Sequence, residues 1–372
     1  MTEDSFFETL QTQHAKQLPF VVYSRPINSS IKCWLQKDDT VHKTDSFTES
    51  GFVFSPFNLN EKSILFPKEA CVFSEIDIET LEAEAIEPIA IVENETDRIQ
   101  HIELVSKGIE SIIEGELQKV VLSRCKTKTL KDSNPVSIFK RLFNRYKNAM
   151  VYCWYHPKVG LWIGATPELL LKVEGKRLTT ISLAGTQPYN EVSKPTWTHK
   201  EFEEQQIVTD YITKQIQPYT KQVNVSEVDT VRAGSLLHLK TRITSLIKEE
   251  SDLKEIIEAL HPTPAVSGFP KADAKSFILE NENYKRDFYT GFLGELNLKQ
   301  GRTRNTNRRN VENNAYAVVR TQSNFYVNLR CMQLVDNTAH IYVGGGITKD
   351  SNPEKEWEET VNKTSTIGSV LD

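Results

Sequence analysis

The stretch from His340 to Lys363, HIYVGGGITKDSNPEKEWEETVNK, constrains this 372-residue chain more than any other. Its three consecutive glycines let backbone N–H groups come close to a ligand, because no Cβ keeps the ligand away. Asn352 is a favoured N-cap residue, and Pro353 suits the first position of a helix. The pattern therefore predicts a short strand, the glycines, a polar turn and then a helix.

The predicted helix carries Glu356, Glu359 and Lys363 on one face, since they are spaced i, i+3 and i+7. Two carboxylates and an ammonium beside bare backbone indicate a site for an anion and a metal ion. A tight turn followed by a solvated helix explains the same residues, and on this stretch alone that simpler interpretation is favoured. The P-loop lysine and the G-x-G-x-x-G spacing are both missing, which leaves a small carboxylate-bearing molecule as the natural ligand.

The composition is that of an ordinary globular protein, with 38% hydrophobic and 26% charged residues. A net charge of −5 gives no reason to expect nucleic acid or an anionic membrane as a partner. No apolar run approaches the length of a transmembrane helix, and the acidic N-terminus does not resemble a signal peptide. The five scattered cysteines are interpreted as reduced thiols. We therefore expect a cytoplasmic protein.

Short apolar runs separated by polar turns fill the chain from residue 19 to about residue 92 and predict strands. A helix is expected from Arg98 to Glu116. The strand QKVVLSRC follows, with Lys119 on the same face as Val121. A lysine at this place often extends to solvent, and the sequence alone favours that interpretation. The alternative is a partly desolvated amine that acts as a base.

Three further acidic or basic side chains stand out. Glu168 immediately precedes the apolar run Leu169-Leu170-Leu171, so it either lines the strand entrance or is an acid with a raised pKa. Glu204 lies at the head of the apolar stripe of a helix that begins with a Thr198–Glu201 capping box. A carboxylate in that position must be paired, protonated or bound to a metal. Arg330 lies in the predicted strand NFYVNLRCMQLV.

Two other segments have the composition of pocket walls. The strand RLTTISLAGTQP ends with Gly185, which permits close approach of a ligand, and Thr186, which offers a hydroxyl. The proline-rich loop HPTPAVSGFP begins with His261 and contains Ala265, although a purely structural elbow explains it equally well. The basic stretch from residue 298 to 314 is expected to be an exposed hairpin loop.

Eight segments together resemble the chorismate-utilising enzymes, and most closely the isochorismate synthases among them. In chain order they are QKVVLSR, GATPELLL, LAGT, KEFEEQQIV, LHPTPAVSGFP, ENENYKRDFYTGFLGE, NLRC and GGGITKDSNPEKEWEET-NK. They run from about residue 98 to residue 370. The resemblance implies an α/β (α+β) fold: a layered antiparallel β-sandwich wrapped by helices, with a central cleft. It also implies a variable strand-rich portion, residues 1–95, packed on the same unit as a chorismate-binding catalytic portion, residues 96–372.

The resemblance assigns roles that the chemistry supports. Chorismate carries its ring hydroxyl at C4 and isochorismate carries it at C2, so water must attack C2 while hydroxide leaves C4. Lys119 matches the family's base and Glu168 matches its acid; burial shifts both pKa values in the required directions. Mg²⁺ would lie between Glu204 and Glu359, with Glu356 and Glu282 acting through water.

The same resemblance places the substrate. Arg330, Lys363 and the N–H groups of Gly344, Gly345 and Gly346 would hold the pyruvyl carboxylate. The ring pocket would be lined by a further set: Gly185, Thr186, His261 and Ala265. One departure from the family is Gln205, which stands where a histidine is common.

The loop and two single residues separate the activities within the family. Anthranilate synthases usually carry glutamine in place of Lys119, and aminodeoxychorismate synthases carry a lysine in place of Ala184. Salicylate synthases share the lysine but usually lack the HPTP loop, so an isochorismate synthase (an isomerase of menaquinone or siderophore biosynthesis) is the expected activity. The rivals are a salicylate synthase, a chorismate-binding protein without turnover, and an ammonia-dependent synthase subunit. We expect no obligatory glutaminase partner and a monomer or weak dimer.

Overall fold

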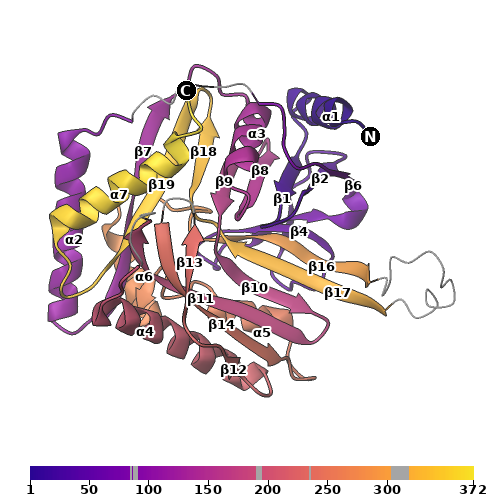
Figure 1. Cartoon of the computed structure of the whole chain (residues 1–372). Coiled ribbons are helices and arrows are strands. Elements are labelled where there is room, and N and C mark those ends of the chain that lie inside the picture. The colour runs from indigo at the N-terminus through magenta and orange to yellow at the C-terminus, as the bar shows by residue number, and fades with distance from the viewer. Residues whose placement is uncertain (84–85, 87–90, 190–194, 234–235, 303–317) are drawn as a thin grey trace.

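The strands of this protein form two antiparallel sheets that lie face to face, with helices on their outer sides (Figure 1). The structure is a computed structural model, and it describes residues 1–83, 86, 91–189, 195–233, 236–302 and 318–372. This is the layered β-sandwich wrapped by helices that the sequence analysis expected, so the predicted fold class is confirmed.

The first sheet has nine strands in the order β15-β7-β19-β18-β9-β8-β1-β2-β6. In that order their bounds are Gly268–Phe269, Lys119–Thr129, Thr338–Ile347, Cys331–Val335, Gly160–Thr166, Met150–His156, Phe20–Ser24, Ser30–Gln36 and Cys71–Asp77. Strand β19 pairs with β7 along its whole length, from Thr338 opposite Thr129 to Ile347 opposite Val120. The three glycines of the 340–363 stretch are therefore strand residues, next to the strand that begins with Lys119.

The second sheet has ten strands in the order β12-β14-β11-β10-β17-β16-β4-β5-β3, with β13 paired to β14. Their bounds are, in that order and ending with β13, Asn224–Val225, Leu236–Leu246, Arg177–Pro188, Leu169–Glu174, Val318–Val327, Phe292–Arg302, Gly51–Ser55, Ser63–Pro67, His42–Thr44 and Asp229–Ala233. Strands β16 and β17 pair up to Arg302 opposite Val318, as in a hairpin. The expected loop is wrong for residues 298–302, which belong to β16. The rest of the predicted loop falls within residues 303–317, outside the described residues.

Seven α-helices occur in the described part of the chain. They are α1 Glu3–Ala15, α2 Glu95–Ile113, α3 Pro135–Arg145, α4 His199–Ile216, α5 Leu253–Leu260, α6 Lys271–Asn281 and α7 Pro353–Gly368. Helices α1 and α3 pack on the first sheet, α4 and α5 cover the second, and α2 lies against α7 beside β7 and β19 (Figure 1). None of these helices combines the length and the apolar character needed to cross a membrane.

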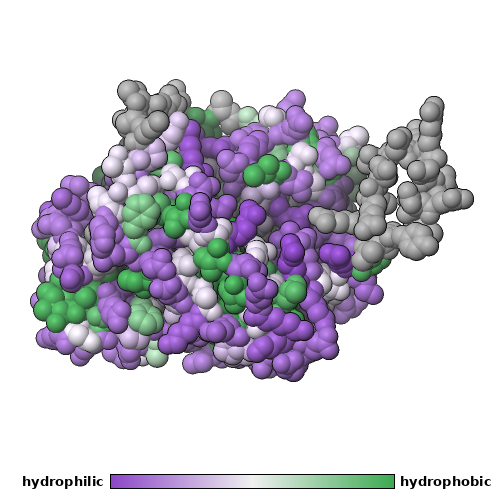
Figure 2. Space-filling model, turned by 60° about the horizontal axis from the view of Figure 1, so that its bottom comes forward, coloured by the Kyte–Doolittle hydropathy of each residue, from purple (hydrophilic) through white to green (hydrophobic). Residues whose placement is uncertain are grey.

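The core follows from the strict alternation of side chains along each strand. In β8, Tyr152 and Trp154 face an aromatic-rich core between the two sheets, whereas Val151 and Cys153 face the helices of the outer layer. The strand is buried on both faces, which is why its sequence is continuously apolar rather than alternating. Outside, hydrophilic residues predominate on the face shown in Figure 2, and the hydrophobic ones form small separate groups.

The N-terminal strands extend both sheets. Strands β1, β2 and β6 continue the first sheet beyond β8, and β4, β5 and β3 continue the second beyond β16. The early part of the chain is thus packed on the same unit as the later part. The predicted boundary between an N-terminal portion and a catalytic portion near residue 95 stays a prediction, because both sheets contain strands from before and after it.

Local signals placed several elements correctly. Asn352 is the N-cap of α7, where its side chain accepts a hydrogen bond from the Lys355 N–H, and Pro353 is the first helical residue. The capping box of Thr198 and Glu201 begins α4. Helix α1 was not anticipated, although the side chain of Thr2 caps its start.

Candidate active site

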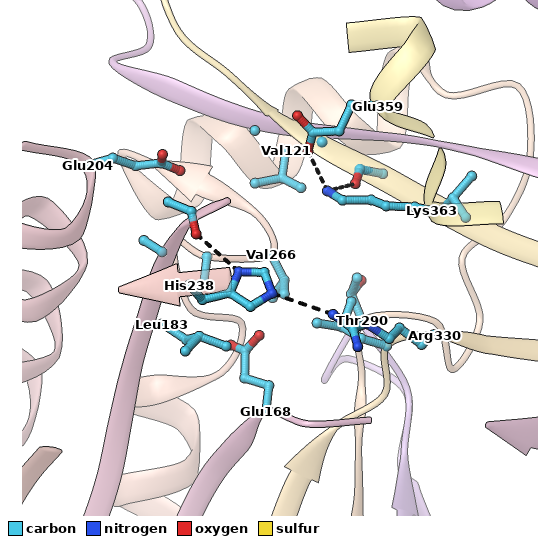
Figure 3. Close-up of a pocket in the computed structure, with 18 of the residues that line it drawn as sticks. Val121, Glu168, Leu183, Glu204, His238, Val266, Thr290, Arg330, Glu359 and Lys363 are labelled. Atoms are coloured by element: carbon cyan, nitrogen blue, oxygen red, sulfur yellow. Dashed lines mark hydrogen bonds and ion pairs between the residues drawn. The ribbon is translucent and has the colours of Figure 1, made fainter. Parts of the chain in front are cut away.

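A cavity of about 230 Å³ lies where the two sheets meet helices α4 and α7. Most of the side chains proposed from the sequence line it, together with the three glycines of β19. Figure 3 shows five of the predicted residues around it: Glu168, Glu204, Arg330, Glu359 and Lys363. The predicted residues that line it are Lys119, Glu168, Gly185, Glu204, Ala265, Arg330, Gly344, Gly345, Gly346, Glu356, Glu359 and Lys363. Residues from eight separate segments of the sequence therefore meet at one place.

Glu168 and Arg330 come together because the chain crosses between the sheets twice at neighbouring points. Glu168 lies between β9 of the first sheet and β10 of the second, and Arg330 lies between β17 and β18. The two crossings are bonded to each other: the Val327 N–H donates to the Glu168 carbonyl at 2.9 Å, and the Ala165 N–H donates to the Arg330 carbonyl at 3.0 Å. Pairing of β9 with β18 and of β10 with β17 thus fixes both side chains.

The crossing corrects the predicted strand NFYVNLRCMQLV. Strand β17 ends at Val327 and β18 begins at Cys331, so Arg330 is not a strand residue. Its φ is 47°, in the left-handed region that side-chain-bearing residues rarely adopt. The reason is that the chain must turn from one sheet into the other here. The surrounding hydrogen bonds hold Arg330 in a backbone conformation that costs about 1–3 kcal/mol elsewhere.

Glu168 is buried inside the cavity wall, where only 7% of the residue is exposed. Burial raises the pKa of its carboxyl to about 7, while Lys119 and Arg330 lower it by a smaller amount. Near neutral pH the side chain is therefore divided between the acid and the carboxylate. A carboxyl group with this pKa can give up a proton to a leaving group.

Lys119 does not extend to solvent: it is 2% exposed, and its Nζ lies 2.6 Å from Glu204 Oε1. The glycine at position 346 leaves room for this pair. A Cβ there would lie 3.1 Å from Lys119 Cε and 3.4 Å from Glu204 Oε1. The favoured interpretation of Lys119 as a solvent-seeking side chain is therefore wrong, and the glycine is explained by the pair.

Helix α7 presents its predicted face to the cavity. Lys363 Nζ lies 2.6 Å from Glu359 Oε1 and donates to the Gly344 carbonyl at 2.8 Å, which ties the helix to β19. At Gly345 a Cβ would meet Glu356 Oε2 at 3.4 Å and Glu359 Oε1 at 3.7 Å. Because Gly345 and Gly346 have no side chains, space remains beside their backbone, bordered by carboxylates of both α7 and α4. We call this space the glycine cradle.

The carboxylates around the glycine cradle are of the chemical type that binds magnesium. Glu204, Glu356 and Glu359 are hard oxygen ligands around the glycine cradle, and magnesium prefers one or two carboxylates with waters and substrate oxygens. In the described residues, no three acidic, histidine or cysteine side chains already form a closed metal site. Glu204 and Glu359 each contact a lysine instead. The arrangement can hold a cation between these carboxylates.

His238, from β14, is a cavity residue that the sequence analysis missed. Its Nδ1 lies 3.0 Å from the Gly185 carbonyl and its Nε2 lies 3.4 Å from Arg330 Nη2 (Figure 3). Burial, and then the charge of Arg330, lower the pKa of the imidazole to about 4, so the ring is neutral. Its Nδ1–H therefore donates to the carbonyl, and Nε2 accepts from the guanidinium. The only sequence signal was a histidine between leucines in SLLHLK.

Other cavity residues were also missed as site residues. Among them are Glu201, Tyr289, Thr290 and Thr348. Glu201 was identified only as part of the capping box, a local role that masks its place in the cavity wall. For the other three, nothing in the sequence pattern separates them from ordinary packing residues.

Three of the predicted residues were not found in the cavity wall: two lie away from it, and the side chain of the third is outside the described residues. His261 does not line the cavity; it is 1% exposed, its Nε2 lies 3.2 Å from the Phe57 carbonyl, and its ring packs on Phe292. The apolar stripe of α5 faces the core and turns His261 inward with it. Glu282 is held by Arg286 and Ser123. Thr186 lies in β11, and its side chain is outside the described residues.

Two family models match this chain. One described as a chorismate binding enzyme matches residues 67–302, and a second with the same description matches residues 315–369. The first match alone covers more than half of the sequence. The chain therefore belongs to the chorismate-binding enzyme family.

Curated relatives agree with this assignment. Isochorismate synthase MenF of Pasteurella multocida is 29% identical over 301 residues, which cover 76% of this chain and 64% of that protein. Isochorismate synthase MenF of Escherichia coli is 29% identical over 305 residues, with 77% and 65% covered. The matched part of this chain thus spans a little less than two thirds of the length of either relative.

The fold is also that of a solved structure. MenF, the menaquinone-specific isochorismate synthase from Escherichia coli, superposes on 95% of this chain and 89% of its own, with a TM-score of 0.72 and 20% identity. At this identity the likeness concerns the fold. It supports the two-sheet architecture that brings Glu168 and Arg330 together.

Proposed function

We propose that this protein is an isochorismate synthase that isomerises chorismate in a magnesium-dependent reaction. Water adds at C2 of the ring, and the C4 hydroxyl leaves. The observation that carries the proposal is that Lys119 and Glu168 line one cavity, with the pKa of Glu168 raised to about 7 by burial. The names of the two relatives and the membership of the family support it.

Glu168 in its protonated form gives its proton to the hydroxyl that leaves C4. Lys119 in its neutral form takes a proton from the water that attacks C2. Glu204 holds Lys119 as an ion pair at 2.6 Å, so activation of water requires Glu204 to be engaged elsewhere. Both groups act inside a buried wall, where protons are exchanged with the substrate and the attacking water rather than with bulk water.

Glu204, Glu359 and Glu356 would hold Mg²⁺ at the glycine cradle. The chemistry that magnesium supplies when bound is to neutralise these carboxylates and hold the ring carboxylate of chorismate. Arg330, Lys363 and the backbone of Gly344–Gly346 bind the pyruvyl carboxylate. His238 holds Arg330 in place by accepting a hydrogen bond from its guanidinium. Ala265 and Gly185 leave space for the ring.

A direct assay tests the proposal. Purified protein with chorismate and magnesium should form isochorismate, measured by chromatography, with no fluorescent salicylate. Abundant salicylate would instead indicate a salicylate synthase. Binding of chorismate without any product would indicate a non-catalytic chorismate-binding protein. Formation of anthranilate with ammonia would indicate an amino-transferring synthase, which Lys119 and Ala184 count against. The product fits menaquinone or siderophore synthesis equally.

Substitution of His238 by alanine should raise KM for chorismate about tenfold or more, because a hydrogen bond to a charged group contributes about 1.5–3 kcal/mol. The physical reason is that Arg330, half-buried and in a left-handed conformation, loses an acceptor that helps to fix its guanidinium. Steady-state kinetics measure the effect. His238→Gln, which can still offer an acceptor, is the matched variant and should recover part of the loss. Equal KM values in all three proteins would contradict this role.

A further inference from the structure

Glu282 and Arg286 form a buried ion pair directly after α6. Their side chains are 1% and 2% exposed. Arg286 Nη2 lies 2.5 Å from Glu282 Oε1, and its Nε donates to Oε2 at 2.7 Å, so the pairing is bidentate. Burial opposes the charge on Arg286, but the attraction of Glu282 outweighs it and raises the pKa of the guanidinium. Arg286 therefore stays charged inside the protein.

The pair is bonded to the strand that carries Lys119. Glu282 Oε1 accepts from the Ser123 N–H at 2.8 Å and from the Ser123 hydroxyl at 2.7 Å. Arg286 Nη2 donates to the Val121 carbonyl at 2.7 Å. Val121 is two residues from Lys119 and lines the cavity (Figure 3). The pair thus fixes β7 at the position from which Lys119 projects.

Arg286 also holds two other segments of the cavity wall. Its Nη1 donates to the Val266 carbonyl at 3.0 Å, in the loop after α5, and to the Thr290 hydroxyl at 3.2 Å, before β16. Both residues line the cavity, and Figure 3 shows them there with Val121. Arg286 itself is not a lining residue. One guanidinium therefore joins three wall segments that are far apart in the sequence.

We propose that the Glu282–Arg286 pair is a positioning unit of the active site. It holds the strand that carries Lys119 in a fixed position relative to the wall segments at Val266 and Thr290. This inference rests on the proposed function, since it concerns the geometry in which chorismate reacts. A buried pair kept only for stability is replaceable at small cost by well-packed residues. A pair in which arginine directs five N–H donors at fixed acceptors is not replaceable in this way, because only the arginine side chain presents five donors in one rigid plane.

The chain contains a matched control. Glu295 is equally buried, with a side chain 2% exposed, and it binds Lys32 at 3.0 Å and Arg25 at 3.4 Å. This network also includes Tyr23, and it lies in the core between the sheets. None of these four residues lines the cavity. Substitution of Glu295 therefore disturbs a buried ion pair without touching the site.

The experiment compares Arg286→Lys, Arg286→Ala and Glu295→Gln with the wild-type protein, at a temperature at which each is folded. Arg286→Lys should lower kcat for chorismate about 10- to 100-fold, since displacements of about 1 Å cost this much. Added guanidinium should restore part of the activity of Arg286→Ala. Glu295→Gln should lower the denaturation midpoint while kcat and KM change less than about twofold. If Arg286→Ala does not fold, Arg286→Lys carries the test.

Amide hydrogen exchange supplies a readout that needs no turnover. Exchange at Val121, Ser123 and Val266 should become faster in Arg286→Lys and stay unchanged in Glu295→Gln. Unchanged exchange there, or equal losses of kcat in the arginine and Glu295 variants, would overturn the positioning role. A wild-type protein that forms no isochorismate would overturn the proposed function instead, and the exchange result would then still decide whether the pair orders the cavity walls.

Discussion

Replacement of Glu168 by glutamine should lower the turnover of chorismate by about 10²–10⁴-fold, the usual contribution of a general acid. Glutamine keeps the size of the side chain and most of its hydrogen-bonding capacity, but it cannot give a proton to the leaving hydroxyl. The fold should be unaffected, because the residue packs in the same wall. Steady-state kinetics with purified variants measure the loss. Turnover close to that of the wild type would remove Glu168 from the mechanism.

The pH dependence gives this prediction a second, independent form. Burial raises the pKa of Glu168 from 4.5 to about 7, so the acid form is lost as the pH rises through 7. Activity that requires the acid form should fall about tenfold for each pH unit above that value. The residual activity of Glu168→Gln should not show this fall. A wild-type profile that stays flat from pH 6 to pH 9 would contradict the assignment.

The same pKa makes a prediction about stability. A carboxyl whose pKa is raised on folding contributes stability that is fully present below pH 4.5 and is lost as the pH rises through about 7. The change from 4.5 to about 7 corresponds to about 3 kcal/mol. Glu168→Gln should therefore be more stable than the wild type at pH 8 and similar to it at pH 4, as measured by urea denaturation. A loss of stability of this kind is expected of an active site that keeps an acid buried for its chemistry.

Signals that act within one turn of helix or one strand could be recognised from the sequence. Asn352 with Pro353, and Thr198 with Glu201, define helix starts through bonds to residues three positions away at most. The common face of Glu356, Glu359 and Lys363 follows from the helical period. These predictions hold because the interactions that cause them are encoded in neighbouring residues.

Contacts between distant segments could not be derived in this way. The pairing of Lys119 with Glu204 joins residues 85 positions apart. Glu204 lies on α4, which packs on β11 and β14 of the second sheet, and Lys119 begins β7 of the first, so only the tertiary fold brings them together. His238 and Arg330 are 92 positions apart. The residue types of Lys119, Glu204 and Arg330 suggested candidates for a site, and that of His238 did not; sequence spacing contains no information on such distances. The family resemblance supplied the set that spacing alone left open.

The break at Arg330 shows why even a local element was misjudged. The run NFYVNLRCMQLV has the apolar content of one strand, and no glycine or proline marks an interruption. The chain nevertheless passes from the second sheet into the first there, with Arg330 at a φ of 47°. Hydrogen bonds to the neighbouring crossing at residues 165–168 impose this conformation. Tertiary structure outweighs local preference at Arg330, the residue proposed to bind the substrate.

Removal of either proposed metal carboxylate should have an effect as large as the loss of the acid. Glu204→Gln and Glu359→Ala should each lower magnesium-dependent turnover by about 10²–10³-fold, because a bound metal contributes several kcal/mol of charge stabilisation. Glutamine is chosen at position 204 because it still offers an oxygen to Lys119, which is 2% exposed and would otherwise lose its partner. Magnesium binding, measured by calorimetry without substrate, should weaken in both variants.

Each variant has a neighbour that serves as its control. Glu203 precedes Glu204 on α4 and pairs with His199 at the surface, and Glu358 precedes Glu359 on α7 and is exposed. Alanine at either position removes the same charge from the same helix but from a face that points away from the cavity. Glu203→Ala and Glu358→Ala should therefore keep both turnover and magnesium affinity within about twofold. If Glu204→Gln and Glu359→Ala behaved like these controls, the cradle of Gly345 and Gly346 would bind the substrate's carboxylate directly, and magnesium would have no place in this site.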